Sequence, residues 1–287
     1  MALLACAADM ATCYRHPNRE TGVSCSNCGR PICPDCMTPT SVGMRCPECA
    51  RQKTKVRTAA QINAAYDRPI VTTAIIIACV VLFVGTGGGI GLQSSGHGWI
   101  YDHLALQGFT TIHFGHDYWR LVTSGFLHAG LFHIGFNMYL LWLLGRQLEP
   151  AMGSVRFATV YFTCLLAGSF GGLVQTSTAV IVGASGAVFG LMTVLAVEQF
   201  RRGLDPFAGG LGALILINLA FGFIPSFNIA VGAHIGGLIA GGLAGFAFHQ
   251  ADRMRQPWLG YAACAAIAVA AVLGAIAVSG NIHNYQL

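Results

Sequence analysis

Charged residues are scarce in this sequence. Asp, Glu, Lys and Arg make up 9% of the 287 residues, whereas hydrophobic residues make up 54%. This balance is too apolar for a soluble domain of this length and predicts an all-α, polytopic membrane protein. Lysine is missing after Lys55, and nine of the sixteen Lys and Arg residues lie at or before Arg68. The basic residues therefore indicate membrane orientation and offer no surface for nucleic acid.

Aspartate is absent from every apolar segment that could span a bilayer. There are seven such segments, covering residues 70–84, 131–148, 155–175, 184–200, 207–224, 229–248 and 258–278. The first, with its flanks, just reaches the ~20 residues that a transmembrane helix needs. Without an intramembrane aspartate, neither an aspartate pair nor the third member of a Ser-His-Asp triad is available there.

Seven spans place the two termini on opposite sides of the membrane. If the N-terminus is cytoplasmic, fifteen of the sixteen basic residues lie inside and only Arg120 lies outside. This distribution agrees with the positive-inside rule. We therefore expect a multi-pass protein, of the plasma membrane, with a cytoplasmic N-terminus and an external C-terminus at Leu287.

The cysteines are not spaced like a disulfide framework, because seven of the eleven lie between Cys13 and Cys49 in short pairs. Together with one histidine they form four pairs: Cys13 and His16, Cys25 and Cys28, Cys33 and Cys36, and Cys46 and Cys49. Eight ligands suffice for two tetrahedral zinc ions, and so short a segment with almost no apolar core would need the metal to fold. The alternative is a disordered tail with free thiols.

This cysteine pattern resembles B-box-like cross-brace zinc fingers. The resemblance implies that the first and third pairs share one ion, and the second and fourth pairs the other. We expect a finger over residues 1–57 with a basic linker to 68, a helical core over 69–250, and a seventh helix with an external tail over 251–287. A reducing cytoplasm suits thiolate ligands, in agreement with the orientation above. The finger offers a site for a cytoplasmic protein partner.

Residues 91–120 form a long connection that contains four histidines and no sustained apolar run. A loop of this length is expected to be structured and to lie at the membrane interface. The histidines His97, His103, His113 and His116 are irregularly spaced, which favours solvated or hydrogen-bonded side chains over metal ligands.

Four polar residues lie near the outer ends of descending spans. His133 and Asn137 are four residues apart and share one helix face, Ser185 opens the fourth span, and His234 lies in the sixth. An intramembrane histidine is costly and marks a candidate functional site, although a hydrogen bond to a neighbouring helix is the ordinary alternative. A nucleophile, a base and two hydrogen-bond donors are the parts needed for acyl transfer, and a Ser-His dyad is the arrangement that remains.

The motifs around these residues resemble the rhomboid family of intramembrane serine proteases. They are Trp119-Arg120, Phe126-Leu127-His128 through His133-x-x-x-Asn137-Met138, Glu149-x-x-x-Gly153, Gly183-x-Ser185-Gly186 and Ala233-His234-x-x-Gly237-x-x-x-Gly241. The resemblance implies a six-helix core with an outward-facing water-filled cavity, to which this chain adds a C-terminal transmembrane helix. It implies Ser185 as nucleophile, His234 as general base, and His133, Asn137 and the Ser185 amide as the oxyanion hole. The fifth span would be the lateral gate for a substrate helix.

Other matched residues would have supporting roles in such a protein. The resemblance implies that His128 and Glu149 tie loops and helix ends together and that Trp119 and Arg120 anchor the first loop. Gly237 and Gly241 lie one and two turns beyond His234, and their small size predicts a close approach of the sixth span to the fourth.

The chain departs from many relatives at two places. Phe189 occupies the position where many relatives stack a tyrosine on the catalytic histidine, so it keeps the ring and lacks the hydroxyl. The N-terminal finger is the second departure, because many rhomboids lack one.

The expected activity is endoproteolysis of single-span membrane proteins in the lipid bilayer, with two structural zinc ions and no catalytic cofactor. A non-catalytic relative that binds or escorts membrane helices is the alternative; such relatives usually lack the serine or the histidine. A zinc-finger membrane adaptor is a third interpretation, but it leaves the aligned polar residues unexplained.

Overall fold

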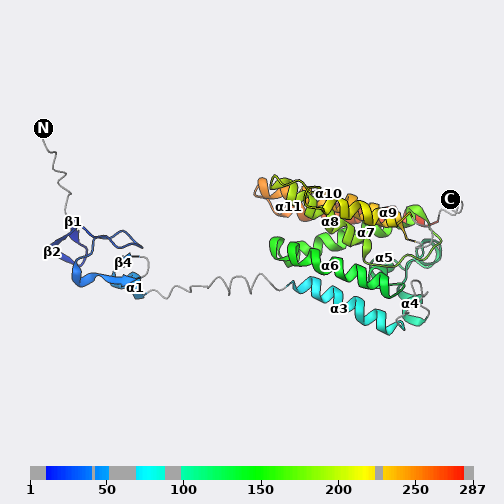
Figure 1. Ribbon diagram of the computed structural model, residues 1–287, viewed down its shortest axis with the longest axis horizontal. Coiled ribbons are helices and arrows are strands. Elements are labelled where there is room, and N and C mark those ends of the chain that lie inside the picture. The colour runs from blue at the N-terminus through cyan, green and yellow to red at the C-terminus, as the bar shows by residue number, and fades with distance from the viewer. Residues whose placement is uncertain (1–10, 41–42, 52–68, 88–97, 224–228, 281–287) are drawn as a thin grey trace. The chain divides into compact units, whose positions relative to one another are not determined.

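The computed structural model describes residues 11–40, 43–51, 69–87, 98–223 and 229–280. Most of the expected basic linker, His97 and the expected external tail at Leu287 lie outside the described residues. The chain divides into two compact units, Met1–Ile62 and Asn63–Leu287, with a boundary that falls inside the basic linker. Figure 1 shows the small mixed unit and the helical unit.

The N-terminal unit consists of short strands around buried thiols. Strands β1 (Ala11–Cys13) and β2 (His16–Thr21) pair antiparallel, as do β3 (Thr38–Thr40) and β4 (Gly43–Arg45), and the unit also holds η1 (Pro34–Cys36) and α1 (Pro47–Arg51). Its buried cluster contains cysteines and one aliphatic side chain, Ile32. So small an apolar core agrees with the expectation that bound metal would have to stabilise the fold.

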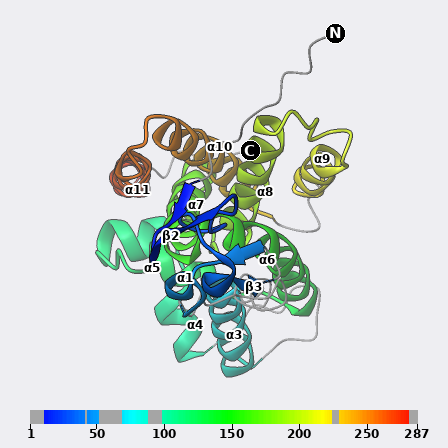
Figure 2. The ribbon, with the colours of Figure 1, turned by 90° about the vertical axis from the view of Figure 1, so that its left-hand side faces the viewer.

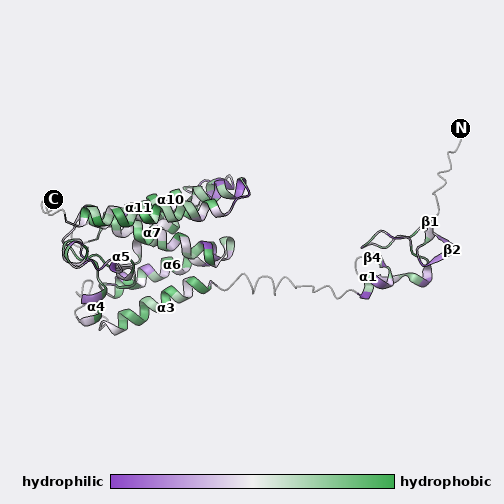
Figure 3. Cartoon of the chain, turned by 180° about the vertical axis from the view of Figure 1, so that it is seen from behind, coloured by the Kyte–Doolittle hydropathy of each residue, from purple (hydrophilic) through white to green (hydrophobic). Residues whose placement is uncertain are grey.

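The second unit is helical. Its elements are α3 (Ile70–Gly85), α4 (Trp99–Leu104), η2 (Gly108–Phe114), α5 (Arg120–Thr123), η3 (Ser124–Phe126), α6 (Leu131–Met152), α7 (Ser154–Gln175), α8 (Ser185–Arg201), α9 (Leu211–Phe221), α10 (Val231–Arg253) and α11 (Trp258–Ser279). Figure 3 shows hydrophobic residues along these helices and more hydrophilic ones near their ends.

Each of the seven expected apolar segments contains a helix, and most boundaries agree within a few residues. The main difference is α9, because the segment expected over residues 207–224 forms only eleven helical residues. The helix starts after Gly210, whose φ of 79° is left-handed and interrupts the apolar run. Hydropathy could not reveal this interruption, since residues 207–210 include a phenylalanine, an alanine and two glycines.

The apolar helices support a multi-pass membrane protein. Among the described residues, α7, α10 and α11 are long and apolar enough to cross a bilayer, and the bent pair made by Arg120–Phe126 and Leu131–Met152 would add a fourth crossing. Helices α3 and α9 are apolar but shorter. The expected count of seven spans therefore stays a prediction.

Helices α7, α8 and α10 pack against one another at the centre of the helical unit. Helix α11 packs on α7 and α10, α9 packs on α8, and α3 packs on α6. Viewed near end-on in Figure 2, α9 and α11 lie on opposite sides of this central group. The central position of α8 places its first residue, Ser185, among the surrounding helices.

The long first loop is structured from residue 98 onward, as expected. It contains α4 and η2, and buried Arg120 holds it in place. The Arg120 guanidinium donates to the carbonyls of Asp102 and Ala105, and its Nη2 lies 2.8 Å from the carboxylate of Asp117. Two described histidines of this loop make local hydrogen bonds in which the ring Nδ1–H donates to a carbonyl: His103 to Trp99 at 2.7 Å and His116 to Ile112 at 3.5 Å.

Candidate active site

Ser185 and His234 meet at the start of α8. The Ser185 Oγ lies 3.0 Å from His234 Nε2, although the two residues are 49 positions apart. Ser185 is the first residue of α8, and His234 lies one turn into α10 and is buried. A hydroxyl at this distance can give its proton to a neutral imidazole.

The ring of Phe189 covers the imidazole of His234. The two ring centroids are 4.1 Å apart and the rings are inclined by 16°, so they are stacked. Phe189 lies one turn after Ser185 on α8, which places its ring beside the serine. The Nδ1 atom of His234 is buried and has no hydrogen-bond partner among the described residues. Stacking, rather than a carboxylate, therefore holds the imidazole in orientation.

His133 and Asn137 lie on the same face of α6, and His133 lies beside Gly183, two residues before Ser185. The backbone N–H of Ala129 donates to His133 Nδ1 at 3.3 Å, so the proton of the neutral ring resides on Nε2. That Nε2 atom is directed at Gly183, where an added Cβ would lie 2.7 Å away. The Asn137 side chain donates one N–H to the His133 carbonyl at 2.9 Å and carries a second. Both side chains can thus supply N–H donors.

Gly183 fits its place because of its backbone angle and its lack of a side chain. Its φ is 124°, which side-chain-bearing residues rarely adopt, and its backbone N–H donates to the Ser124 carbonyl at 3.0 Å. The segment before Ser185 is thereby fixed beside His133.

Helices α8 and α10 approach closely through glycines. An added Cβ on Gly237 would lie 1.8 Å from the Gly186 carbonyl oxygen, and one on Gly241 would lie 2.1 Å from that of Gly190. Neither position can therefore carry a side chain without moving a helix. This contact brings the His234 imidazole within reach of Ser185.

Glu149 joins three helix ends. Its carboxylate accepts hydrogen bonds from the backbone N–H groups of Val71 and Thr72, at 2.9 and 2.8 Å, and from the Ser154 hydroxyl at 2.7 Å. A carboxylate at the N-terminus of α3 also interacts favourably with the helix dipole. Glu149 thus ties the C-terminal end of α6 to the starts of α3 and α7, at the end of α6 away from His133.

Trp119 and His128, the other residues expected to have supporting roles, differ in how far they are buried. Trp119 is more than half exposed and donates its indole N–H to the His103 carbonyl at 3.4 Å. His128 is buried against the His133 ring, with centroids 5.0 Å apart, and neither of its ring nitrogens has a hydrogen-bond partner within the described part of the chain. Burial and the contact with the His133 ring hold His128 in place, and its expected role in tying a loop to a helix end stays a prediction.

Two residues near the dyad carried no recognisable sequence signal. Gln175, the last residue of α7, accepts a hydrogen bond from the Gly232 backbone N–H at 2.7 Å and so caps the start of α10. The Thr193 hydroxyl lies 3.0 Å from the carbonyls of both Phe189 and Leu238. Isolated Gln and Thr residues in apolar segments have many possible partners, so only the packing of the helices identifies these contacts.

In the N-terminal unit the four ligand pairs form two clusters. One contains Cys13, His16, Cys33 and Cys36, and the other contains Cys25, Cys28, Cys46 and Cys49. Within each cluster the candidate ligand atoms lie within 4.8 Å of one another. The first pair thus lies with the third and the second with the fourth, as expected, and the sharing of one ion within each group stays a prediction.

The spacing of the clusters suits a tetrahedral metal ion. The Sγ atoms of Cys28 and Cys46 are 3.8 Å apart, and His16 Nδ1 lies 3.2 Å from Cys33 Sγ. Zinc–sulfur bonds of about 2.3 Å imply a sulfur–sulfur separation of roughly 3.8 Å in a tetrahedron. Both groups of side chains could therefore hold a metal, with His16 binding through Nδ1.

The thiols of Cys13 and Cys25 ionise more readily than an ordinary cysteine. Burial by itself raises the pKa of each thiol, but backbone hydrogen bonds, to Cys13 from Cys33 and to Cys25 from Cys46, outweigh it and lower the pKa to about 6. Thiolates are the form that binds metal, so the lowered pKa of these two thiols suits a role as metal ligands.

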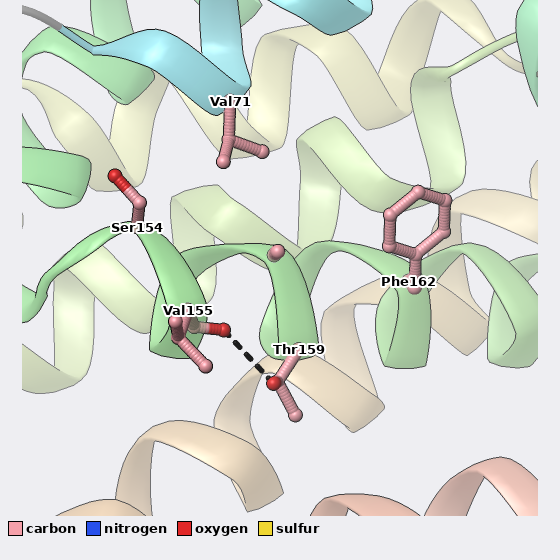
Figure 4. A pocket seen from close by; sticks show the side chains of 6 residues that line it. Val71, Ser154, Val155, Thr159 and Phe162 are labelled. Carbon is pink, nitrogen blue, oxygen red and sulfur yellow. Dashed lines mark hydrogen bonds between the residues drawn. The ribbon is translucent and has the colours of Figure 1, made fainter.

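A shallow hollow also lies between α3 and α7. Val71, Ser154, Val155, Ala158, Thr159 and Phe162 line it, and Figure 4 shows the Val71 side chain directed from α3 toward α7. The Thr159 hydroxyl donates to the Val155 carbonyl of its own helix at 2.9 Å. No nucleophile and base face each other among these lining residues, so the hollow offers no catalytic group.

Comparison with known proteins matches residues 115–251 to the Rhomboid domain. The chain is 39% identical over 128 residues to Rhomboid protease GluP of Bacillus subtilis, covering 44% of this chain and 25% of the relative. It is 36% identical over 152 residues to RHOMBOID-like protein 1 of Arabidopsis thaliana, covering 51% of this chain and 37% of the relative. The chain thus spans less than half the length of these two relatives.

A third relative is matched over most of its length. The chain is 38% identical over 144 residues to Putative rhomboid protease YdcA of Bacillus subtilis, covering 48% of this chain and 71% of the relative. The matched residues include Ser185 and His234, the central helices that carry them and the loop that precedes α6. The chain belongs to the rhomboid family.

Proposed function

We propose that the protein is an intramembrane serine endopeptidase that cleaves transmembrane or juxtamembrane segments of other membrane proteins. The observation that carries the proposal is the 3.0 Å contact between Ser185 Oγ and His234 Nε2 in a family that includes named proteases. A serine kept at hydrogen-bond distance from a buried imidazole is poised for nucleophilic attack on a carbonyl.

In this proposal His234 Nε2 takes the Ser185 proton as Oγ attacks the peptide carbonyl. The resulting oxyanion accepts hydrogen bonds from His133 Nε2–H, the Asn137 side chain and the Ser185 backbone amide. The imidazolium then gives its proton to the leaving amine, which departs as the acyl-enzyme forms. Water repeats the sequence, with His234 as base, and releases the carboxylate product and free Ser185.

The neutral tautomer of His133 supports its role as a donor. Because Nδ1 already accepts from Ala129, the ring carries its proton on Nε2, which faces Gly183. Donors fixed before the reaction stabilise a developing negative charge without reorganising. The absence of a side chain at Gly183 leaves that donor accessible.

The alternative function is helix binding without cleavage, as some family members are named only rhomboid-like. Retention of Ser185, His234, His133 and Asn137 favours the enzyme. The test is cleavage of a single-span membrane substrate by the purified full-length chain in detergent. Wild type should cleave and Ser185→Ala should not; equal cleavage by both would rule out Ser185 as the nucleophile.

We further propose that each N-terminal cluster binds one structural zinc ion, so that the N-terminal unit is a B-box-like finger. In this proposal the finger faces the cytoplasm and binds a cytoplasmic protein. The distribution of basic residues supports an external end of the chain, and residence in the plasma membrane is part of the same proposal. An alkaline-phosphatase fusion after Leu287 should be active, and one before Pro69 should be inactive. The reverse pattern would invert the topology.

A further inference from the structure

Helix α11 lies beyond residues 115–251, which match the family domain, yet it is packed into the helical unit. It contacts α7 along its length and also contacts η2 of the first loop. Ala275 and Ser279, on its second half, are fully buried, whereas Leu273 is 62% exposed. One face of α11 therefore packs against the rest of the helical unit, and the other face is exposed.

The buried face belongs to a hydrophobic cluster that α11 shares with the first loop. Its fully or almost fully buried members are Leu106, Ile112, Leu121, Leu173, Ile181 and Ala275. Leu106 and Ile112 come from the loop, Leu173 comes from α7, and Ile181 comes from the segment that precedes α8. Ala275 is thus buried in one cluster with residues of the loop and of the segment that precedes α8.

Two further contacts place α11 close against its neighbours. An added Cβ on Gly274 would lie 2.8 Å from the Phe170 ring of α7, and one on Gly280 would lie 2.7 Å from the His113 ring of η2. His113 in turn stacks on Phe109, with centroids 5.9 Å apart. The end of α11 is therefore fitted against the loop.

A short path of backbone hydrogen bonds leads from this cluster to the dyad. Leu106 and Ile181 form an antiparallel bridge, in which Ile181 N–H donates to the Leu106 carbonyl at 2.8 Å and Leu106 N–H donates to Ile181 at 3.4 Å. Two residues later, Gly183 N–H donates to Ser124 at 3.0 Å. Gly183 lies against His133 and two residues before Ser185.

We propose that α11 is a brace for the active site, and that Ala275 is a positioning residue that acts through Ile181 and Gly183. Its small side chain lets α11 pack against the loop and hold Ile181 in its bridge with Leu106. This keeps Gly183 and the Ser185 amide aligned with His133. The effect on turnover rests on the proposed protease function, whereas the bracing of residues 181–183 does not.

A matched pair of substitutions tests the proposal. Ala275→Leu adds bulk inside the cluster, and Ala277→Leu makes the same change two residues away at an exposed position of the same helix. Misplacement of catalytic groups by about 1 Å can cost on the order of 10²-fold in rate. We expect Ala275→Leu to lower kcat by roughly 10- to 100-fold with KM within about twofold, and Ala277→Leu to change neither.

Amide hydrogen exchange of the full-length chain tests whether α11 holds residues 181–183 in place, independently of any cleavage. Ala275→Leu should speed amide exchange at Ile181 and Gly183, whereas Ala277→Leu should not. If wild type cleaves nothing, the protease proposal fails and the exchange rates still decide the brace. Unchanged exchange and unchanged kcat in folded Ala275→Leu would refute the brace; if that variant does not fold, Ala275→Val provides the same comparison with less added volume.

Discussion

The orientation of His234 depends on a ring contact. Its Nδ1 atom has no hydrogen-bond partner among the described residues, and the Phe189 ring lies 4.1 Å from the imidazole centroid. In a triad, a carboxylate fixes the tautomer and the ring orientation. Here the stacked phenylalanine supplies orientation through packing, so the dyad should be sensitive to the size of the side chain at position 189.

We therefore expect Phe189→Ala to remove much of the cleavage rate, whereas Phe189→Tyr keeps the ring and should be tolerated. The measurement is kcat of each purified variant beside its melting temperature. A Phe189→Ala variant that is folded and as fast as wild type would show that stacking does not orient His234.

The oxyanion donors should each contribute a part of the rate. Loss of one such donor typically costs roughly 10²- to 10³-fold in kcat. We expect His133→Ala and Asn137→Ala each to be slow but measurable, in contrast to inactive Ser185→Ala. Single-turnover cleavage by the variants checks this order. If Asn137→Ala matches wild type, its second N–H does not reach the oxyanion.

At the scale of helices, the dyad depends on how closely α8 and α10 approach. Gly237 permits this approach, because an added Cβ would lie 1.8 Å from the Gly186 carbonyl oxygen. Gly242, on the same helix, has more room: its added Cβ would be 3.9 Å from the nearest atom. Replacing each of these two glycines by alanine therefore makes the same change on the same helix, once in a tight contact and once with room for a methyl group.

Gly237→Ala should separate α8 from α10, lower stability by roughly 1–3 kcal/mol and abolish most activity. Gly242→Ala should be close to wild type in both respects, since its methyl group meets only ordinary contact. Thermal unfolding and kcat of both variants check the expectation. Equal behaviour of the two variants would mean that the close approach at Gly237 is not required.

The helices themselves were largely predictable from hydropathy, and the contacts between them only in part. Residues 258–278 form a helix whose apolar run is long and uninterrupted, and residues 131–148 are apolar enough to predict one despite His133 and Asn137. The short α9 was not anticipated, since Gly210 in a left-handed conformation looks like any other glycine in sequence. Glycine spacing after His234 predicted the approach of α8 and α10, whereas the Gln175 cap and the α11 cluster depend on packing between distant segments.

At the scale of the whole chain, the finger and the helical unit are separate compact bodies. The thiol clusters of the finger have the ligand count and spacing for two metal ions, and its apolar core is small. Structural zinc supplies on the order of 10 kcal/mol or more to folding in domains of this kind. Folding of the finger should therefore depend on metal, and folding of the helical unit should not.

Purified full-length protein should contain two zinc ions per chain. Their removal by a chelator should abolish the finger's structure while leaving probe labelling of Ser185 intact. Elemental analysis of protein treated with and without chelator, with labelling in parallel, tests both statements. A content of one zinc or none would contradict the two-site assignment, and loss of labelling would show that the finger supports catalysis.

The central claim is that Ser185 is a nucleophile activated by His234 inside a membrane-embedded protein. The most direct measurement is labelling of the full-length chain by a fluorophosphonate in detergent, with the modified peptide identified by mass spectrometry. We predict that in wild type Ser185 Oγ forms a bond to phosphorus as the P–F bond breaks and fluoride leaves. We expect no labelling of Ser185→Ala and much slower labelling of His234→Ala. Labelling that persists in Ser185→Ala, or a wild type that neither reacts nor cleaves a membrane substrate, would contradict the account.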